Sequence, residues 1–400
     1  MTEFVKKRKF FIASFLLAMT FCNLTLPFRV LPKLRNGYQD FTIYYMSGVL
    51  LRNGQASDLY NPSTQSRTQA TFAPVPIRPE PLPYNHPPFE ALLFVPFTLL
   101  GYWPAYLLWT AISMVLLAVS VVLLRRQFPQ LAAVPPLILG LGATAFFPVT
   151  VGILHGQDVF LLLLLFALAV VCLDRGKEAW AGAFLAAGLF RPHLIVPVVI
   201  LLAARRWRLL LGFVPVALVL AGISVAITGW GGPLNYLRLV LQVENSPACP
   251  GCYGPHTIPN LRGLIQKLPV LSASSPWATV LILASSMVVF FVAMRRISNG
   301  RDSIGFSSSL AAVTALLVSY HLLTHELILL LPLLLFLISQ VVNVEGKTID
   351  TRTVLVILLS LTPLYVFLLW AVKCFFLFSL ILLWLYVRLL LTPAPAGVPA

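Results

Sequence analysis

The stretch that decides the fold is residues 104–124, which read PAYLLWTAISMVLLAVSVVLL and are followed directly by Arg125 and Arg126. No charged side chain interrupts it, and about 20 apolar residues are enough for a helix to cross a bilayer. An arginine pair at the end of such a run is typical of its cytoplasmic boundary. The stretch therefore predicts a membrane-spanning helix with its C-terminal end in the cytoplasm.

The rest of the chain repeats this pattern. Of its 400 residues, 59% are hydrophobic and only 10% are charged, which is too apolar for a soluble globular protein. The apolar runs are also too long and continuous for the alternating strands of a membrane barrel. The formal net charge of +15 sits in short clusters between these runs, which indicates membrane lipids and not nucleic acid as the partner. We expect an all-α polytopic membrane protein.

Twelve spans are predicted, with both termini in the cytoplasm. The first, at about 10–31, follows the basic residues Lys6 to Lys9 and lacks a small-residue cleavage site, so it is expected to stay uncleaved. The other predicted spans are 104–124, 131–150, 157–173, 178–190, 194–204, 209–228, 276–294, 304–320, 326–342, 353–371 and 372–391. Basic residues then gather in the short segments between spans, and this asymmetry sets the orientation.

The apolar run at 88–101 is assigned to the membrane interface. It has about 14 residues, contains Pro96 and carries Glu90 near its start. If it crossed the membrane, Arg125, Arg126 and every later basic cluster would lie outside. An interfacial helix keeps the basic clusters in the cytoplasm.

The chain is expected to form one integral membrane domain over residues 1–400. Its first outside loop, 32–102, holds interfacial helices at 41–52 (short and amphipathic) and 88–101. A second large outside loop at 229–275 is rich in Gly and Pro and is expected to be irregular, and the tail at 392–400 is expected to be a disordered cytoplasmic segment.

The cysteines give only local information. Cys249 and Cys252 can form a small disulfide if their loop faces an oxidising compartment. A zinc site would need two further ligands, and only His256 is near. Cys22, Cys172 and Cys374 lie in apolar spans and are expected to be inert.

The segment after the first span reads NGYQDFTIYY over residues 36–45 and contains Asp40. The chain has only 13 acidic residues, so a carboxylate at a predicted membrane boundary is a candidate functional group. Two roles fit its position, and they can coexist. Asp40 can act as a general base, or it can cap helix 41–52 by accepting backbone N–H bonds.

Further polar side chains fall on the same predicted side of the membrane. They are His155, Gln157, Asp158, Arg191, His193, Asn260, Arg262, Ser319, His321, His325 and Glu326. Ionisable groups are costly at membrane depth, so a one-sided collection of them indicates a functional site. Simpler roles stay open, because Arg191 can extend its charged head to the interface and Asp158 can cap a helix.

The histidine pair His321 and His325 is four residues apart, which would place both on one face of a helix. That spacing suits a metal, a structural hydrogen bond, or the binding of phosphate or acceptor. The order His-x-x-x-His-Glu lacks the carboxylate pattern of the zinc proteases.

The order and spacing of several short motifs resemble glycosyltransferase family 87. The motifs are Asp40 after the first span, Gly54, Leu59-Tyr60-Asn61-Pro62, His86-Pro87-Pro88-Phe89 with Pro96, Ala105 to Trp109, Gly156-Gln157, Ala181-Gly182, Arg191-Pro192, and Ser319 with His325-Glu326. The resemblance covers about residues 8–340. The family includes the mannosyltransferases of phosphatidylinositol mannoside synthesis and belongs to the GT-C superfamily. Arg191 replaces a common Lys, and Tyr320 follows Ser319 where Pro is usual.

The resemblance implies a GT-C-type fold and a hexosyltransferase. Such an enzyme moves a hexose, mannose by family analogy, from a polyprenyl-phosphate-sugar donor to a lipid or glycan acceptor hydroxyl with inversion. The active site would lie on the periplasmic or extracellular side of the plasma membrane. No cofactor or metal is expected, because the phosphate leaving group is already a stable anion and no Asp-x-Asp motif lies near Asp40.

Site roles follow from this expectation. Asp40 would be the catalytic base. The donor phosphate would be bound by Arg191, His193, His321 and His325, and the substrates by Tyr44, His86, Gln157, Asp158, Asn260 and Glu326.

Two other classes of protein remain open. A lipid or sugar transporter or flippase would commonly show internal repeats and polar residues at the membrane midplane, and neither is evident here. A non-catalytic scaffold would leave the one-sided Asp, Arg and His collection without a role. Chemical change of a lipid-linked sugar, as opposed to its movement alone, separates the transferase from the transporter.

Overall fold

The computed structural model describes residues 3–35, 37, 39–73, 82–245, 254–268, 275–299, 302–343 and 350–392. Within these ranges all regular secondary structure is helical and no strand is present. Every predicted apolar span contains a helix or a bent pair of helices, with bounds shifted by a few residues. The prediction of an all-α membrane protein is confirmed.

Among the residues that the structure describes, five continuous helices are long and apolar enough to cross a membrane. They are α1 (Glu3–Arg35), α5 (Tyr102–Gln127), η3 with α12 (Trp207–Leu209 and Leu210–Thr228), α15 (Pro276–Asn299), and η5 with α17 (Thr324–Leu330 and Leu331–Asn343). Helices α12 and α15 expose large apolar side chains such as Leu218 and Trp277, 67% and 73% accessible, as lipid-facing helices do.

Two bent pairs raise the number of candidate spans to seven. Helices α7 (Pro136–Ala145) and α8 (Phe147–His155) meet at 64°, and α18 (Thr351–Ser360) meets the segment of α19 and η6 (Thr362–Val366 and Phe367–Ala371) at 57°. Pro148 and Pro363 lie in the first turn after each bend, where proline favours a helix start.

Shorter helices fill the interior and the connections. They are α6 (Pro129–Ala132), α9 (Val159–Asp174), α10 (Glu178–Ala187), α11 (Pro192–Ala203), α16 (Ile304–Val318), η7 (Phe375–Leu377) and α20 (Phe378–Leu391). Helices α9, α11 and α16 are packed into the main apolar core.

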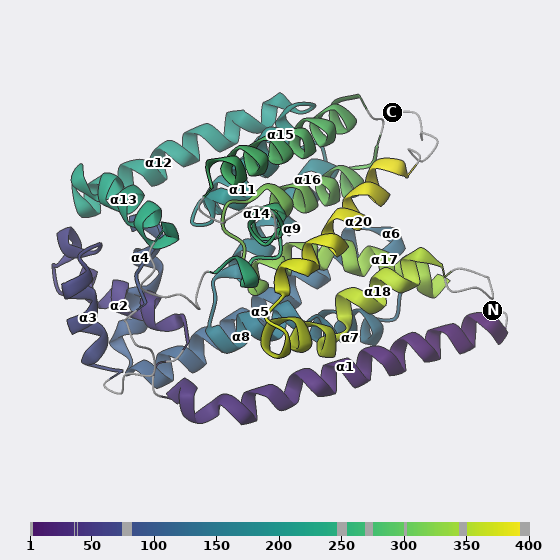
Figure 1. The fold of residues 1–400 in the computed structure, drawn as a ribbon, viewed down its shortest axis with the longest axis horizontal. Helices are drawn as coiled ribbons and strands as arrows, with labels where there is room; N and C mark the ends of the chain where they lie inside the picture. Colours follow the sequence, from purple (N-terminus) through teal and green to yellow (C-terminus); the bar gives the residue numbers. More distant parts are fainter. Residues whose placement is uncertain are drawn as a thin grey trace.

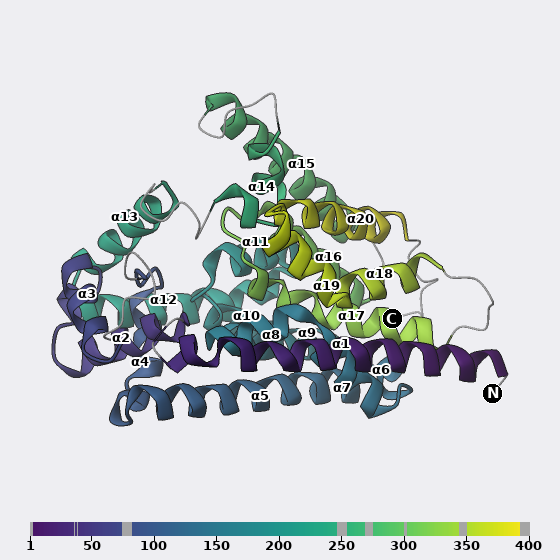
Figure 2. The ribbon, with the colours of Figure 1, turned by 60° about the horizontal axis from the view of Figure 1, so that its bottom comes forward.

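The bundle has two distinct ends (Figure 1). Helix α1 runs along the bundle toward the end that holds α2 (Phe41–Arg52), α3 (Pro62–Ala70) and α4 (Pro88–Phe94). The short helix η1 (Ala56–Asp58) lies between α2 and α3 in the chain. At the opposite end, Arg8 Nη2 lies 3.2 Å from Asp350 Oδ1, and Gln127 donates to Asp174 across 2.7 Å. Helix α15 lies on the opposite flank from α1 in both views (Figure 2).

Helix α2 confirms the predicted helix at 41–52, and most of its side chains are buried. Nine of its 12 residues are buried, because α3, α4, α5 and η2 (Pro96–Leu99) all contact it. Helix α4 approaches closely at Gly48, where a side-chain carbon would lie 2.8 Å from the backbone oxygen of Phe94. An aromatic cluster that includes Phe41, Tyr44 and Trp109 fills the remaining space.

The run at 88–101 forms α4 and then η2, which begins at Pro96. It is among the apolar helices too short for a regular span, and Glu90 is 3% exposed within it. Its placement in the membrane interface stays a prediction.

The second large loop is more ordered than expected. Residues Gly231–Asn245 form α13, since Pro233 near its start favours a helix, and η4 (Pro255–Thr257) and α14 (Leu261–Gln266) follow. The prediction of an irregular segment is therefore wrong for this part. Cys249, Cys252 and the tail beyond residue 392 lie outside the described residues.

Candidate active site

Asp40 directs its carboxylate toward the turn between α8 and α9. Its Oδ2 accepts a hydrogen bond of 2.6 Å from Gln157 Nε2, and His155 Nδ1 lies 3.2 Å from the same oxygen. Asp40 occupies the N-cap position of α2, but its side chain makes no capping bond there. The capping interpretation is therefore wrong. With 18% of its side chain accessible, Asp40 can still meet a ligand.

The α8–α9 turn depends on Gly156. Its φ of 60° is left-handed and ends α8, a position that favours glycine. A side-chain carbon at Gly156 would lie 2.8 Å from Phe41 Cβ, and Trp109 Nε1 donates to the Gly156 carbonyl across 2.9 Å. This close packing against α2 and α5 brings His155 and Gln157 to Asp40.

Gly156→Ala is therefore expected to destabilise the protein. The left-handed conformation costs a residue with a side chain about 1–2 kcal/mol, and the clash with Phe41 adds to this. The melting temperature of the detergent-solubilised protein should fall. Gly140→Ala is the matched control, because Gly140 lies in α7 with nothing within 4 Å of an added carbon. Equal melting of the two variants would contradict the role given to Gly156.

Arg191 is the centre of a buried polar network. The residue is 5% exposed and directly precedes α11. Its Nη2 lies 2.6 Å from Asp158 Oδ1, and its Nε is 3.1 and 3.3 Å from the two Asp158 oxygens. Its Nη1 donates to Glu326 Oε1 across 3.1 Å. All three nitrogens are thus engaged by protein side chains, so the interpretation that Arg191 extends to the interface is wrong.

Gln157 connects this network to Asp40. Its Oε1 accepts from Arg191 Nη2 at 2.6 Å and from the Tyr44 hydroxyl at 2.9 Å, while its Nε2 donates to Asp40. Arg191 Nη2 also lies 3.0 Å from the Tyr44 hydroxyl. One amide therefore links the candidate base to the buried arginine.

Three histidines stand near Glu326. His193 Nε2 lies 2.8 Å from Glu326 Oε1, and its side chain is 24% exposed. The rings of His193 and His321 are nearly perpendicular, with their centroids 5.9 Å apart. His325 is 4% exposed, and its Nε2 has no hydrogen-bond partner among the described residues. His321 precedes η5 in a non-helical segment, so the expected shared helical face with His325 is wrong.

His86 and Glu90 lie beneath the network. His86 Nδ1 is 2.7 Å from Glu90 Oε2 and 3.9 Å from Asp158 Oδ2. Burial lowers the pKa of His86 to about 3 and raises the pKa of Glu90 to about 7. The His86 ring also contacts Tyr44, with ring centroids 5.1 Å apart.

Asn260 has a different position from the other expected substrate-binding residues. Its side chain accepts from Gly263 N at 3.1 Å and so caps α14, and it donates to the Ser319 carbonyl. Arg262 donates to the Tyr320 carbonyl across 2.9 Å. The described contacts of Asn260 thus fasten the second loop to the segment before η5.

His155 contacts Asp40, but from the sequence it was counted only among the polar side chains on one side of the membrane and was given no role in the site. The sequence did indicate that His155 lies at a turn, because Gly156 is suited to end a helix. Proximity to Asp40, 115 positions earlier, could not be read from that signal.

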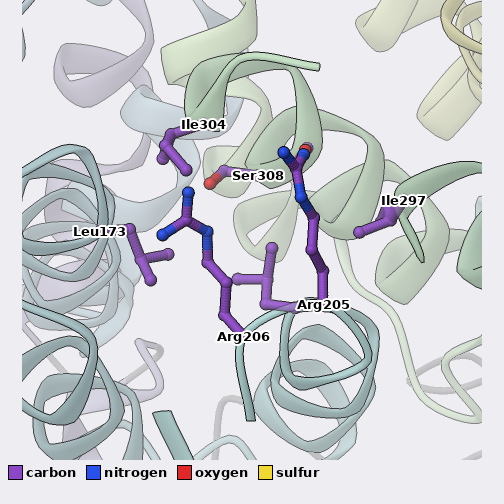
Figure 3. A pocket seen from close by; sticks show the side chains of 8 residues that line it. Leu173, Arg205, Arg206, Ile297, Ile304 and Ser308 are labelled. Carbon is purple, nitrogen blue, oxygen red and sulfur yellow. The ribbon is translucent and has the colours of Figure 1, made fainter. Parts of the chain in front are cut away.

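A separate small pocket lies at the far end of α11 (Figure 3). It is lined by Leu173, Leu202, Arg205, Arg206, Ile297, Ile304, Ser307 and Ser308. Helix α11 has 12 residues and so is about 18 Å long. The pocket is therefore distinct from the Arg191 network at the start of this helix.

A partly accessible carboxylate next to a buried charged network, at one end of an apolar helix bundle, is characteristic of a membrane-embedded enzyme. Comparison with known families finds a match to Glycosyltransferase family 87 over residues 84–319. This range covers more than half of the chain, so the chain belongs to glycosyltransferase family 87. Searches of curated proteins and of solved structures returned no significant match.

Family membership defines the activity in general terms. The protein is a membrane glycosyltransferase, which moves a sugar from a donor to an acceptor. Gln157, Asp158 and Arg191 lie within the matched range, while Asp40 and Glu326 lie outside it.

Proposed function

We propose that the protein transfers a hexose, mannose by family analogy, from a polyprenyl-phosphate-sugar donor to a hydroxyl of a lipid or glycan acceptor. The observation that carries the proposal is the Asp40 carboxylate, 18% accessible and joined through Gln157 to the buried Arg191. A partly accessible carboxylate in such a setting is suited to take a proton from a bound hydroxyl.

The proposed arrangement in the membrane has twelve spans and a GT-C-type fold. The Asp40 end of the bundle would face the outside of the plasma membrane, and the end with Arg8, Arg125 and Arg206 would face the cytoplasm. The distribution of basic residues supports this orientation. Helices α2 and α4 would form part of the first outside loop, with α13 and α14 in the second.

The proposed reaction is a single displacement with inversion. The acceptor oxygen forms a bond to the anomeric carbon as its proton passes to Asp40, and the bond from that carbon to the phosphate oxygen breaks. The polyprenyl phosphate leaves as an anion. A positioned base of this kind contributes about 10²- to 10⁴-fold to the rate.

His155 and Gln157 are assigned to positioning the base. Both approach Oδ2 of Asp40, at 3.2 and 2.6 Å, so they fix the direction of the carboxylate. The bond from Gln157 is a hydrogen bond to a charged group, and such bonds are worth about 1.5–3 kcal/mol, which is enough to hold a side chain in one reactive orientation.

We assign binding of the donor phosphate to the three histidines near Glu326. His193, with 24% of its side chain accessible, His321 and His325 would donate to the phosphate oxygens. Arg191 would supply positive charge from behind them, because its nitrogens already bind Asp158, Glu326 and Gln157.

The expected substrate-binding residues take different roles in this proposal. Tyr44, Asp158 and Glu326 hold Arg191, Gln157 holds Asp40, and His86 supports Asp158 from below. Asn260 would shape the acceptor side by fixing the second loop to Ser319.

The function is tested by incubating membranes that contain the protein with a panel of labelled polyprenyl-phosphate sugars. Label should appear in a new glycosylated product for one sugar, and membranes without the protein should give none. Labelled donor that crosses the membrane chemically unchanged would support the transporter alternative and contradict the transferase.

His155→Ala is expected to lower kcat by about tenfold, because it removes the imidazole that lies 3.2 Å from Asp40 Oδ2 and a tenfold change in rate corresponds to about 1.4 kcal/mol, with little change in the amount of folded protein. The measurement is the transfer rate at saturating donor. His256→Ala is the control, because His256 is also partly buried but lies in η4 of the second loop. A wild-type kcat for His155→Ala would remove His155 from the site.

A further inference from the structure

Three buried side chains from separate parts of the chain converge below the Arg191 network. His86 lies just before α4, Glu90 lies in its first turn, and Asp158 directly precedes α9. One ligand atom from each lies within 4.8 Å of the others. Their exposures are 4%, 3% and 0%, so water does not compensate their polar atoms.

The polar atoms of this His86–Glu90–Asp158 cluster are incompletely satisfied. Neither carboxylate oxygen of Glu90 accepts a hydrogen bond from a donor group among the described residues, and its side chain instead contacts the Asp158 carboxylate. His86 Nδ1 likewise makes no hydrogen bond there. Nδ1 and Glu90 Oε2 are 2.7 Å apart, but their orientation does not suit a hydrogen bond. An unpaired buried charge carries a penalty of several kcal/mol, so a metal ion or a proton between these atoms would stabilise them.

The charge balance leads to the same conclusion. The cluster and the adjoining network contain three buried carboxylates, from Glu90, Asp158 and Glu326, and one buried guanidinium, from Arg191. If all three carboxylates are ionised, they exceed the guanidinium by two negative charges. Buried charges are paired or coordinate metals.

We propose that His86 Nδ1, a carboxylate oxygen of Glu90 and Asp158 Oδ2 bind one divalent transition-metal ion of the zinc type. Nitrogen and oxygen ligands lie about 2.0–2.2 Å from zinc, so two of them on a tetrahedron are roughly 3.4 Å apart. The observed separations from His86 Nδ1, 2.7 and 3.9 Å, bracket this value.

Arg191 is compatible with such an ion. It approaches Asp158 Oδ1 at 2.6 and 3.1 Å but Oδ2 only at 3.3 Å, so Oδ2 keeps a lone pair for a metal. Ligating carboxylates are commonly held by a hydrogen-bond donor in this way. The ion would fasten α4 to the start of α9. Its role would be structural, separate from the proton transfer assigned to Asp40.

The test counts metal on the purified full-length protein. The protein is stripped with a chelator, incubated with Zn²⁺ or Mn²⁺, freed of excess ion, and analysed by mass spectrometry of the metal. We expect about one ion per chain for wild type, and less than a tenth of that for Glu90→Gln and His86→Gln. Glu178→Gln, His256→Gln and the double variant Cys249→Ser, Cys252→Ser are controls that should keep the ion.

A second measurement, the melting temperature of the wild-type protein with and without metal, tests the proposal even if the variants fail to fold. The stripped wild-type protein should melt at a lower temperature than the reloaded protein. The proposal is overturned if wild type retains neither metal, if reloading leaves its melting unchanged, or if Glu90→Gln and His86→Gln retain as much metal as wild type. The first result would assign the missing positive charge to a proton on Glu90. None of these results alters the test of sugar transfer.

Discussion

Asp40→Asn is expected to lower the rate of sugar transfer by about 10²- to 10⁴-fold, while the protein remains in the membrane at its normal level. Asparagine keeps the size of the side chain and can still accept the hydrogen bond from Gln157, but it cannot accept the acceptor's proton. The partial exposure of Asp40 keeps the structural effect small. The measurement is the initial rate at saturating donor, together with the elution profile of the extracted protein.

Asp58→Asn is the matched control for this experiment. Asp58 lies in η1 of the same loop and is partly buried, and the change in chemistry is the same. It should transfer sugar at the wild-type rate. If Asp40→Asn does so as well, the carboxylate is not the base and the mechanism must be reassigned.

Arg191→Met is expected to have the largest effect on stability. Removal of the guanidinium leaves Asp158 and Glu326 buried without their main cation, and breaking such a pair costs about 3–5 kcal/mol. The variant should aggregate on extraction or melt far below wild type. The control is Arg206→Met, because the Arg206–Glu178 pair is partly exposed at 25% and 20% and such pairs contribute about 0–1 kcal/mol.

Arg191→Lys separates stability from donor binding. Lysine keeps the charge but cannot reproduce the forked contacts with Asp158 and Gln157. A folded Arg191→Lys protein should bind donor with near-normal affinity if the histidines are the direct phosphate contacts. A large loss of donor affinity in that folded variant would show direct contact between Arg191 and phosphate.

For Arg191→Met, a melting temperature equal to that of wild type would contradict the central place of Arg191 in the network.

Local composition predicted the helices well, because lipid-facing helices are long apolar runs with basic ends. Helix α5 extends only a few residues beyond the predicted 104–124, and α2 matches 41–52. Counting basic residues also placed Asp40, Gln157, Arg191 and Glu326 on one side, and the structure joins these four in one network.

The sequence did not predict which side chains contact one another. Gln157 joins Asp40 and Arg191, which are 151 positions apart, and no periodicity encodes that contact. The burial of α2 likewise depends on α4 and α5, which follow it in the chain. The capping role of Asp40 failed for the same reason, since contacts from the α8–α9 turn determine its direction.

The most direct test of the central claim is the anomeric configuration of the product. The purified wild-type protein is supplied with a polyprenyl-phosphate sugar of known configuration and an acceptor, and the new glycosidic bond is assigned by nuclear magnetic resonance. With Asp40 as a base in a single displacement, the product has the opposite configuration to the donor. A product with the donor's configuration would exclude a single in-line displacement and would contradict the role assigned to Asp40.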